Sequence, residues 1–137
     1  NLDREVVEWA KANDRVIFHG FSREVPKYMS AMNILVHPTY REGFSMVIQQ
    51  AMAMGCAIIT TDVPGPSEVI EKDKSGLLVP DHNIEKLADA MARLGSDQSL
   101  QSAFSEAGLI RVKEKFERSK MLEMTFENRM KMINREI

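Results

Sequence analysis

One stretch of the chain, YREGFSMVIQQAMAMG at residues 40–55, combines residue types that suit the binding of a phosphorylated ligand. Glu42 directly precedes a Gly-Phe-Ser turn that opens a predicted helix, and Gln50 follows eight residues later. The backbone N–H groups at this helix start belong to Gly43, Phe44, Ser45 and Met46. Such groups have no intrahelical partner, and the helix dipole adds partial positive charge to them. The helix start is therefore predicted to bind an anion such as a phosphate or diphosphate.

The side chains at the two ends of this stretch fit the rest of an extended ligand. A carboxylate such as Glu42 repels phosphate but accepts hydrogen bonds from hydroxyl groups. In a regular helix Gln50 lies about 12 Å further along the axis, where it would meet a more distant part of the ligand. The expected ligand therefore carries hydroxyl groups near Glu42, phosphates at the helix start and further hydroxyl groups near Gln50. A nucleotide sugar has this arrangement. The spacing alone also fits a simpler interpretation, in which Glu42 only complements the helix dipole and Gln50 is solvated.

The segments around this stretch alternate between strand-like and helix-like patterns. Short apolar runs predict strands at 15–20, 34–38, 56–61 and 75–80. Helical spacing predicts helices at 2–12, 22–32, 44–54, 84–94, 98–116 and 120–135, and a helical turn at 67–72. The expected caps are Ser22, Asn83, Asp97 and Ser119 at helix starts and Gly55 at a helix end. Uniformly apolar strands are typical of parallel sheets that helices cover on both faces. The predicted fold class is α/β, with a doubly wound, mainly parallel, Rossmann-like sheet.

In an open parallel sheet, ligands bind beyond the carboxyl ends of the strands. Three predicted strand ends carry notable residues: Gly20 and Phe21 after the first strand, 37–44 after the second, and 62–66 after the third. The predicted anion site lies at the second of these ends, which is where the fold class leads us to expect a ligand.

Composition and charge argue against several classes of function. The net charge is −2 and the basic residues are dispersed, which argues against nucleic-acid binding. The single cysteine, Cys56, cannot form an internal disulfide, which favours a reducing compartment. His19, His37 and His82 lack metal-ligand spacing, so no metal cofactor is expected. No window approaches the roughly 20 apolar residues of a membrane-spanning helix.

The sequence resembles the carboxyl-terminal, donor-binding half of GT-B glycosyltransferases, and within them the large retaining group (group 1, or family 4) of many bacterial polysaccharide transferases. That pattern is a strand ending in Pro-Ser, then Glu-Gly-Phe, a helix with a second Glu at the place of Gln50, and Ala-Met-Ala-x-Gly before the next strand. This chain reads VHPTYREGFSMVIQQAMAMGCAIITTDVPGPSEVI and, later, SGLLVPDHNIEKLADAMARL. The resemblance covers most of residues 15–95 and implies one incomplete half of a GT-B fold.

The resemblance implies a role for each residue of the pattern. Glu42 would contact hydroxyls of the donor sugar and is the expected catalytic residue. The backbone amides around Gly43, Phe44, Ser45 and Met46 would hold the diphosphate and the sugar. Val47 would lie near the ribose, and Gln50 stands where the family usually has the Glu that binds the ribose hydroxyls. Gly20 and Phe21 would lie near the base. The implied donor is a nucleotide sugar, with a UDP-hexose expected, and no metal is implied.

Two features depart from the family pattern. Gln50 supplies a neutral amide, and the loss of a charged acceptor costs about 1–2 kcal/mol, which is roughly tenfold in affinity. The sequence also opens on a helix, and residues 1–137 lack the family's first strand, its basic residues and its acceptor domain. We therefore expect residues 1–137 to be the nucleotide-sugar-binding domain of a glycosyltransferase, as a fragment or truncated gene product that is inactive in transfer alone.

The resemblance also implies partners and leaves alternatives open. The full enzyme would transfer a hexose to a saccharide or lipid-linked acceptor in the cytoplasm, with the inner face of the membrane as an alternative location. Peripheral membrane association and self-association, the latter through the predicted last helix, are further expectations. One alternative is a catalytically silent remnant that serves as a folding or assembly module. Another is a phosphorylase or epimerase-like enzyme built on the same two-domain plan.

Overall fold

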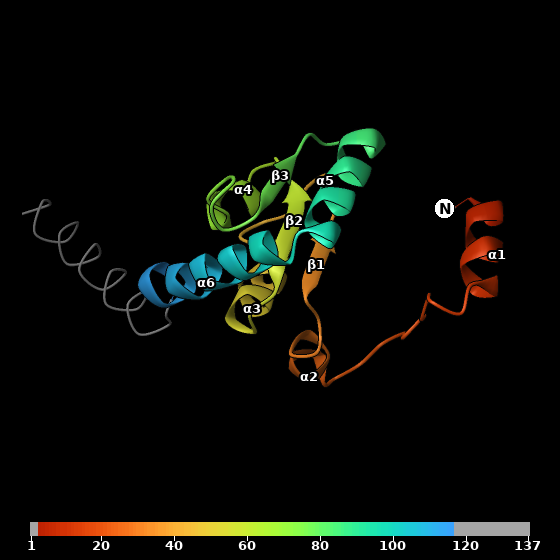
Figure 1. Ribbon diagram of the computed structural model, residues 1–137, viewed down its shortest axis with the longest axis horizontal. Helices are drawn as coiled ribbons and strands as arrows, with labels where there is room; N and C mark the ends of the chain where they lie inside the picture. Colours follow the sequence, from red (N-terminus) through yellow and green to blue (C-terminus); the bar gives the residue numbers. More distant parts are fainter. Residues whose placement is uncertain (1–2, 117–137) are drawn as a thin grey trace, which may run out of the picture.

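Three short strands form the centre of the fold, and helices connect them (Figure 1). The computed structural model describes residues 3–116. The strands are β1 (Ile34–His37), β2 (Ala57–Thr61) and β3 (Leu77–Val79). The helices are α1 (Arg4–Ala12), α2 (Val25–Met29), α3 (Met46–Ala53), α4 (Pro66–Val69), α5 (Ile84–Ser96) and α6 (Gln98–Lys115). From residue 34 onward this order confirms the predicted alternation of strands and helices.

The strands pair in parallel, in the order β1-β2-β3. The register aligns Ile34 with Ala57 and Ile59 with Leu77. Successive residues of a strand point to opposite faces of the sheet. In β2, Ile58 therefore packs on one face while Ala57 and Ile59 pack on the other, and the whole strand is buried. Burial on both faces explains the unbroken apolar runs and confirms the predicted α/β class.

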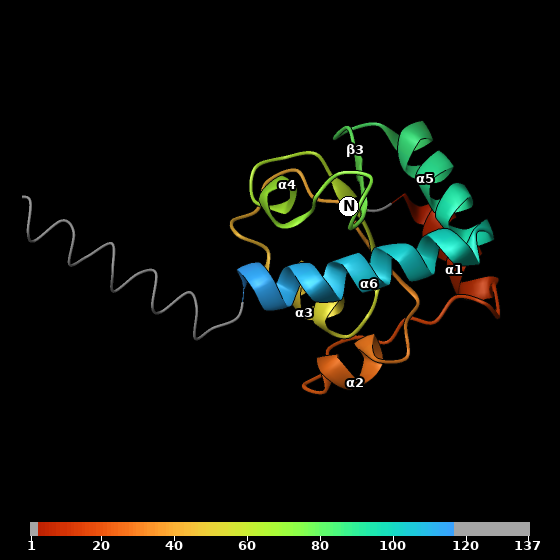
Figure 2. The same ribbon diagram turned by 60° about the vertical axis from the view of Figure 1, so that its left-hand side comes forward.

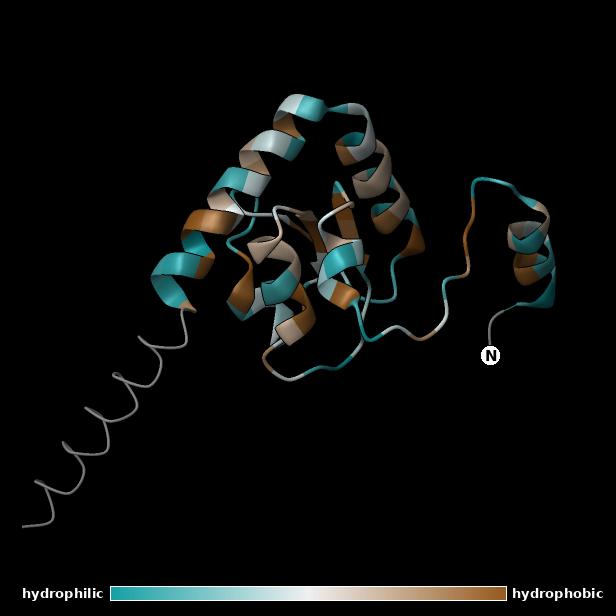
Figure 3. Cartoon of the chain, turned by 90° about the horizontal axis from the view of Figure 1, so that it is seen from below, coloured by the Kyte–Doolittle hydropathy of each residue, from teal (hydrophilic) through white to brown (hydrophobic). Residues whose placement is uncertain are grey.

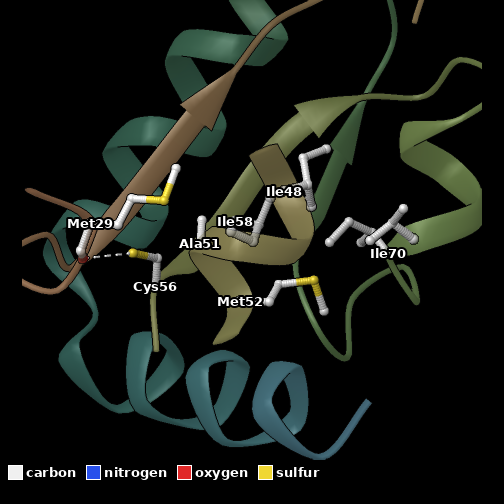
Figure 4. Close-up of a cluster of buried hydrophobic side chains, with 8 residues drawn as sticks. Met29, Ile48, Ala51, Met52, Cys56, Ile58 and Ile70 are labelled. Carbon is white, nitrogen blue, oxygen red and sulfur yellow. Dashed lines mark hydrogen bonds between the residues drawn. The ribbon is translucent and has the colours of Figure 1, made fainter. Parts of the chain in front are cut away.

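Each face of the sheet has its own apolar cluster and its own helices. On the first face, α3 places Ile48 and Met52 against Ile58 of β2 (Figure 4). On the second face, Leu94 of α5 and Phe104 of α6 pack over β2 and β3. The carboxyl-terminal part of α6 returns to the first cluster, so this helix contributes to both faces (Figure 2). Helices on both faces of a parallel sheet form the expected doubly wound arrangement.

Hydrogen bonds confirm the predicted caps of the two long helices. The side-chain oxygens of Asn83 and Asp97 accept backbone N–H groups in the first turns of α5 and α6, at 2.9 Å in each case. Ser45 does the same for α3, where its Oγ accepts the N–H of Ile48. Each cap satisfies one N–H that a helix start leaves without a partner. Gly55 ends α3 with φ at +80°, as expected of a glycine in that position.

The prediction of a buried strand at 15–20 is wrong. The connection from α1 to α2 has no regular secondary structure at these residues, and in the described part of the chain it pairs with no strand (Figure 1). This connection carries apolar residues, coloured brown in Figure 3. Their side chains are exposed, with Ile17 at 83% and Phe21 at 90%. An apolar run becomes a strand only where a neighbouring strand takes up its backbone hydrogen bonds.

The helix predicted at 2–12 is confirmed by α1, whereas α2 is shorter than the helix predicted at 22–32. α2 begins at Val25 rather than after Ser22, because the Ser22 Oγ accepts the N–H of Glu24 in a local turn instead of capping the helix. α1 has no buried residue. The predicted last helix at 120–135, with its cap Ser119, lies outside the described residues. Between residues 3 and 116 no helix is both long and apolar enough to cross a membrane.

Candidate functional site

The carboxyl ends of β1 and β2 are tied together by two threonines of β2. Thr60 Oγ1 donates a hydrogen bond of 2.8 Å to the carbonyl oxygen of His37. Thr61 Oγ1 accepts the N–H of Thr39 at 3.1 Å and donates to the carbonyl oxygen of the same residue. Both threonines are buried, so water does not compete for these bonds. They fix the first residues of the loop 38–45, which carries Glu42.

Tyr40 and His82 connect this loop to the residues that follow β3. Their rings stack with centroids 4.3 Å apart and planes inclined by 10°. His82 has φ at +53°, a region that side chains with a Cβ seldom adopt. The loop is thus attached to the ends of all the strands in the described sheet, and its backbone is a fixed platform for the side chain of Glu42.

Glu42 faces His37, the last residue of β1. The Glu42 Oε2 lies 3.5 Å from the His37 Nδ1. About a quarter of each side chain is exposed, yet these two facing atoms are shielded from solvent, and neither has a hydrogen-bond partner among the described residues. The geometry leaves the other oxygen of the carboxylate, Oε1, as the acceptor that Glu42 can offer to a ligand.

The loop 62–66 packs directly on the backbone next to Glu42. Gly65 has φ at +93°, and a Cβ at this position would lie 2.2 Å from the carbonyl oxygen of Gly43 and 2.7 Å from that of Glu42. Such distances are far below van der Waals contact, so only glycine fits. Gly65 also precedes α4 as its N-cap residue. The loop after β2 therefore supports the loop after β1 through backbone contact.

The start of α3 presents the groups that the sequence predicted for an anion site. Ser45 is buried and its side chain is used as the helix cap, which leaves its backbone N–H for other contacts. Gly43 has open space where a Cβ would stand, so a ligand can approach its backbone. Phe44 turns its ring away to pack edge-on against Phe116, with centroids 5.2 Å apart. Met46 begins the helix itself and is 61% exposed.

The two glutamines of α3 have opposite environments. Gln49 is buried, and its Nε2 donates to the carbonyl oxygen of Ser45 at 3.3 Å. Gln50 is exposed. Residues three and four positions apart share one side of a helix, so Gln50 lies on the same side as Met46 and Val47, both of which are exposed. The structure therefore brings Gln50 and Val47 together beside the helix start.

Gly20 and Phe21 are not brought to this group. Both belong to the exposed connection before α2, and Gly20 lines a shallow hollow with Tyr28 and Met29 of that helix. Within residues 3–116 no hydrogen bond or ring contact joins either residue to Glu42 or to α3. Because residues 15–20 form no strand, Gly20 and Phe21 do not lie at a strand end, and a contact with the base stays a prediction.

Comparison with known proteins decides the family. The family model described as glycosyl transferases group 1 matches residues 1–97. The chain belongs to this family. Curated relatives include the lipopolysaccharide core biosynthesis mannosyltransferase LpsB of Rhizobium meliloti, 30% identical over 82% of this chain and 33% of its own length. The capsular polysaccharide biosynthesis glycosyltransferase CapM of Staphylococcus aureus is 33% identical over 85% of this chain and 30% of its own. The chain thus spans about a third of these relatives.

Solved structures agree with the family assignment. The carboxyl-terminal domain of a group 1 glycosyl transferase (LpcC) of Francisella tularensis has a TM-score of 0.75 and 31% identity, covering 83% of this chain and 60% of that one. HepE of Anabaena in complex with UDP and glucose has a TM-score of 0.82 over 93% of this chain and 36% of its own, with 21% identity, which shows the fold alone. The predicted resemblance to the carboxyl-terminal half of GT-B glycosyltransferases is confirmed.

Sequence patterns do not predict the supporting contacts of three residues in this group 1 glycosyl transferase chain: His37, Thr61 and Gly65. His37 belongs to the notable strand end 37–44, but its lack of metal-ligand spacing gives no sign that it faces Glu42. The available signal for Gly65 was its place in the Pro-Gly-Pro run, where a glycine between prolines suggests a special backbone conformation. Thr61 resembled an ordinary strand residue, and nothing in its neighbourhood marked its contact with Thr39.

The arrangement combines one shielded carboxylate with a helix start that attracts anions. It can accept hydroxyl groups at Glu42 and hold a phosphate at the first turn of α3. In the described part of the chain, no three His, Cys, Asp or Glu side chains gather in a way that could hold a metal ion. That the ligand binds without a metal stays a prediction.

Proposed function

We propose that this chain binds the nucleotide-sugar donor of a retaining glycosyltransferase, with a UDP-hexose as the donor. The observation that carries the proposal is Glu42 held beside the start of α3, where Gly65 packs on its backbone. A hydroxyl acceptor next to an anion site matches a sugar attached to a diphosphate. The complex of HepE with UDP and glucose, a protein of the same fold, supports this choice of ligand.

Each part of the ligand has a candidate partner. The Glu42 carboxylate would accept hydrogen bonds from the sugar hydroxyls, and the backbone N–H groups at 43–46 would hold the diphosphate. Val47 and Gln50, on the exposed side of α3, would lie along the ribose. In transfer, the domain would orient the donor and stabilise the negative charge that develops on the departing diphosphate.

The proposal extends to the whole enzyme. It would transfer a hexose to a saccharide or lipid-linked acceptor in polysaccharide or glycoconjugate biosynthesis, which the names of the lipopolysaccharide and capsule relatives support. A cytoplasmic location is part of the same proposal, because the single cysteine is buried as a free thiol, as in proteins of reducing compartments.

Isothermal titration with UDP and with UDP-hexoses tests the proposal. We expect the chain to bind a UDP-hexose more tightly than UDP. Glu42→Gln should weaken UDP-hexose binding by about tenfold and leave UDP binding nearly unchanged, because only the sugar contact loses its charged acceptor. Glu68→Gln is the matched control, since Glu68 is exposed and belongs to α4, and it should change neither affinity. Equal effects of Glu42→Gln on both ligands would contradict the sugar contact.

A second candidate function is favoured by Gln50. The neutral amide at the family's second carboxylate position fits a catalytically silent remnant that binds donor weakly or not at all and acts as a folding or assembly module. The same titration separates the two candidates. A folded chain that shows no heat of binding at millimolar nucleotide would favour the remnant and refute donor binding.

A further inference from the structure

We infer that His37 positions the Glu42 carboxylate for the donor sugar by donating a hydrogen bond from Nδ1 to Oε2. The inference deepens the proposed function and rests on it, because it concerns the carboxylate assigned to the sugar hydroxyls. His37 would be a positioning residue rather than a catalytic one. Its imidazole would hold one carboxylate oxygen so that the other, Oε1, points into the site.

The first argument is that His37 Nδ1 and Glu42 Oε2 both lack a hydrogen-bond partner in the described part of the chain. The two facing atoms lie 3.5 Å apart, are both shielded from solvent, and have no other hydrogen-bond partner among residues 3–116. A shielded carboxylate oxygen without a partner is costly, because it loses its hydrogen bonds to water and gains nothing in return. A small closing movement brings the pair into hydrogen-bond distance. The pair therefore satisfies two groups that are otherwise unsatisfied.

The second argument is the position of the proton. An ionised carboxylate only accepts hydrogen bonds, whereas a neutral imidazole carries its proton on one nitrogen and a lone pair on the other. A proton on Nε2 alone would direct the Nδ1 lone pair at the carboxylate, which is repulsive. Both the tautomer with its proton on Nδ1 and the doubly protonated ring offer an N–H to Oε2. The contact thus selects protonation at Nδ1.

The third argument is which partner is rigid. His37 belongs to β1, pairs with Thr60 in the sheet register, and has its carbonyl oxygen held by the Thr60 hydroxyl. Glu42 lies in a loop, where its side chain has more freedom to turn than a group on a strand. The strand residue therefore orients the loop residue. Sites that are oriented from strands are held more precisely than sites that are built on loops alone.

Three variants of the full chain test the inference. His37→Leu removes the donor but keeps a side chain of similar bulk. His37→Asn places an amide N–H close to the position of Nδ1, and His37→Gln places it near Nε2. Titrations with UDP and UDP-hexose then give the preference for the sugar nucleotide over UDP, which a general loss of structure would not alter selectively. Matching amide NMR spectra identify the variants that are folded as the wild type is.

We expect His37→Leu to reduce the preference for UDP-hexose by up to about tenfold and to leave UDP affinity within about twofold of the wild-type value. His37→Asn should recover most of the preference, and His37→Gln much less. A folded His37→Leu chain that keeps the wild-type preference overturns the inference. So does a His37→Asn chain that is no better than His37→Leu.

A ligand-free measurement separates failure of this inference from failure of the proposed function. Long-range ¹H–¹⁵N NMR of the His37 ring should show a protonated Nδ1, and Glu42→Gln should shift that nitrogen signal. An unprotonated Nδ1 in the wild type overturns the inference whatever the chain binds. If the wild type binds neither nucleotide, the proposed function fails, and the ring spectrum alone decides whether His37 holds Glu42.

Discussion

Gly65→Ala is the sharpest structural test of the site, because a single methyl group would meet the backbone that carries Glu42. The added Cβ would lie 2.2 Å from the carbonyl oxygen of Gly43, and non-bonded contacts of a real Cβ essentially never fall below 3.0 Å. The two loops must therefore separate by about 0.8 Å at this point. Neither side is a flexible side chain that could rotate away, so the backbone of the loops 38–45 and 62–66 must move.

Two effects should lower the folding stability of Gly65→Ala. An L-residue with φ near +93° is strained by about 1–2 kcal/mol relative to glycine. Forcing an extra methyl group into a packed position adds about 1–3 kcal/mol. We therefore expect the free energy of unfolding to fall by about 2–5 kcal/mol, a large part of the roughly 5–15 kcal/mol that is typical of a folded domain. A displacement close to 1 Å should also weaken UDP-hexose binding by at least about tenfold.

Two alanine variants serve as matched controls. Gly20 also has positive φ, at +71°, but has no neighbour within 4 Å, so Gly20→Ala should cost much less. Gly76→Ala would meet the carbonyl oxygen of Ile58 at 2.8 Å, away from the proposed site, and should lower stability without changing the affinity of the folded fraction. Urea denaturation and nucleotide titration provide both values. If Gly65→Ala unfolds at the urea midpoint of Gly20→Ala and binds as the wild type does, the argument is refuted.

Three further predictions concern residues near the sheet ends and in α3. Thr61→Val should lower the free energy of unfolding by about 1–3 kcal/mol in urea denaturation, because it removes both hydrogen bonds to Thr39. Thr61→Ser keeps the hydroxyl group and should lower the free energy of unfolding much less. Equal losses in the two variants would contradict the role of the hydroxyl group. Burial raises the pKa of the Cys56 thiol above its ordinary value of 9.0, so the unfolded thiol ionises first. Stability should then decline as pH rises above about 9, and Cys56→Ala should show a smaller decline in the same pH series. Gln50→Glu should strengthen UDP binding by about two- to fivefold in calorimetry with no loss of stability, because a charge at this exposed position contributes little. Gln49→Glu should instead destabilise the fold by about 1–3 kcal/mol, because the buried amide of Gln49 is a donor. An unchanged affinity in a folded Gln50→Glu chain would argue against a ribose contact.

The parallel sheet was predictable from sequence because its strands are short and mostly apolar, without the alternation of a half-exposed strand. Residues 57–61 read as one apolar and threonine run, and the structure buries all of them between two layers of helices. The helix starts at Asn83 and Asp97 were predictable for a local reason, since each side chain bonds a backbone N–H only three residues away. Local hydrogen bonds and burial on both faces of a sheet can therefore be predicted from residue types that are close together in the sequence.

The incorrect prediction of a strand at 15–20 shows what a local pattern cannot predict. The run from Val16 to Phe18 is as apolar as the true strands, yet these side chains are exposed in the structure. An apolar run indicates that its side chains favour burial, but a strand also needs a neighbouring strand with which its backbone can pair in register. That second condition depends on parts of the chain that are distant in sequence, and no local pattern reports it.

The site was predictable in its local parts and unpredictable in its long-range ones. Glu42 and the start of α3 are adjacent in sequence, so their chemistry could be inferred from residue types. Gly65 reaches the Gly43 carbonyl from another loop, and His37 meets Glu42 only because the loop 38–45 folds back on the end of β1. Contacts of this kind are fixed by the path of the backbone, which residue types alone do not specify.

The two ends of the proposed site differ in exposure, and exposure decides how much a charge contributes at each end. At the sugar end, the Glu42 Oε2 is shielded from solvent against His37. At the ribose end, Gln50 lies on the exposed side of α3. Charge interactions weaken steeply in the high dielectric of water. Exchanging a carboxylate for an amide therefore costs less at position 50 than at position 42. The departure from the family pattern falls where the site tolerates it best, and this is why a chain with Gln50 can still be expected to hold a nucleotide sugar through Glu42.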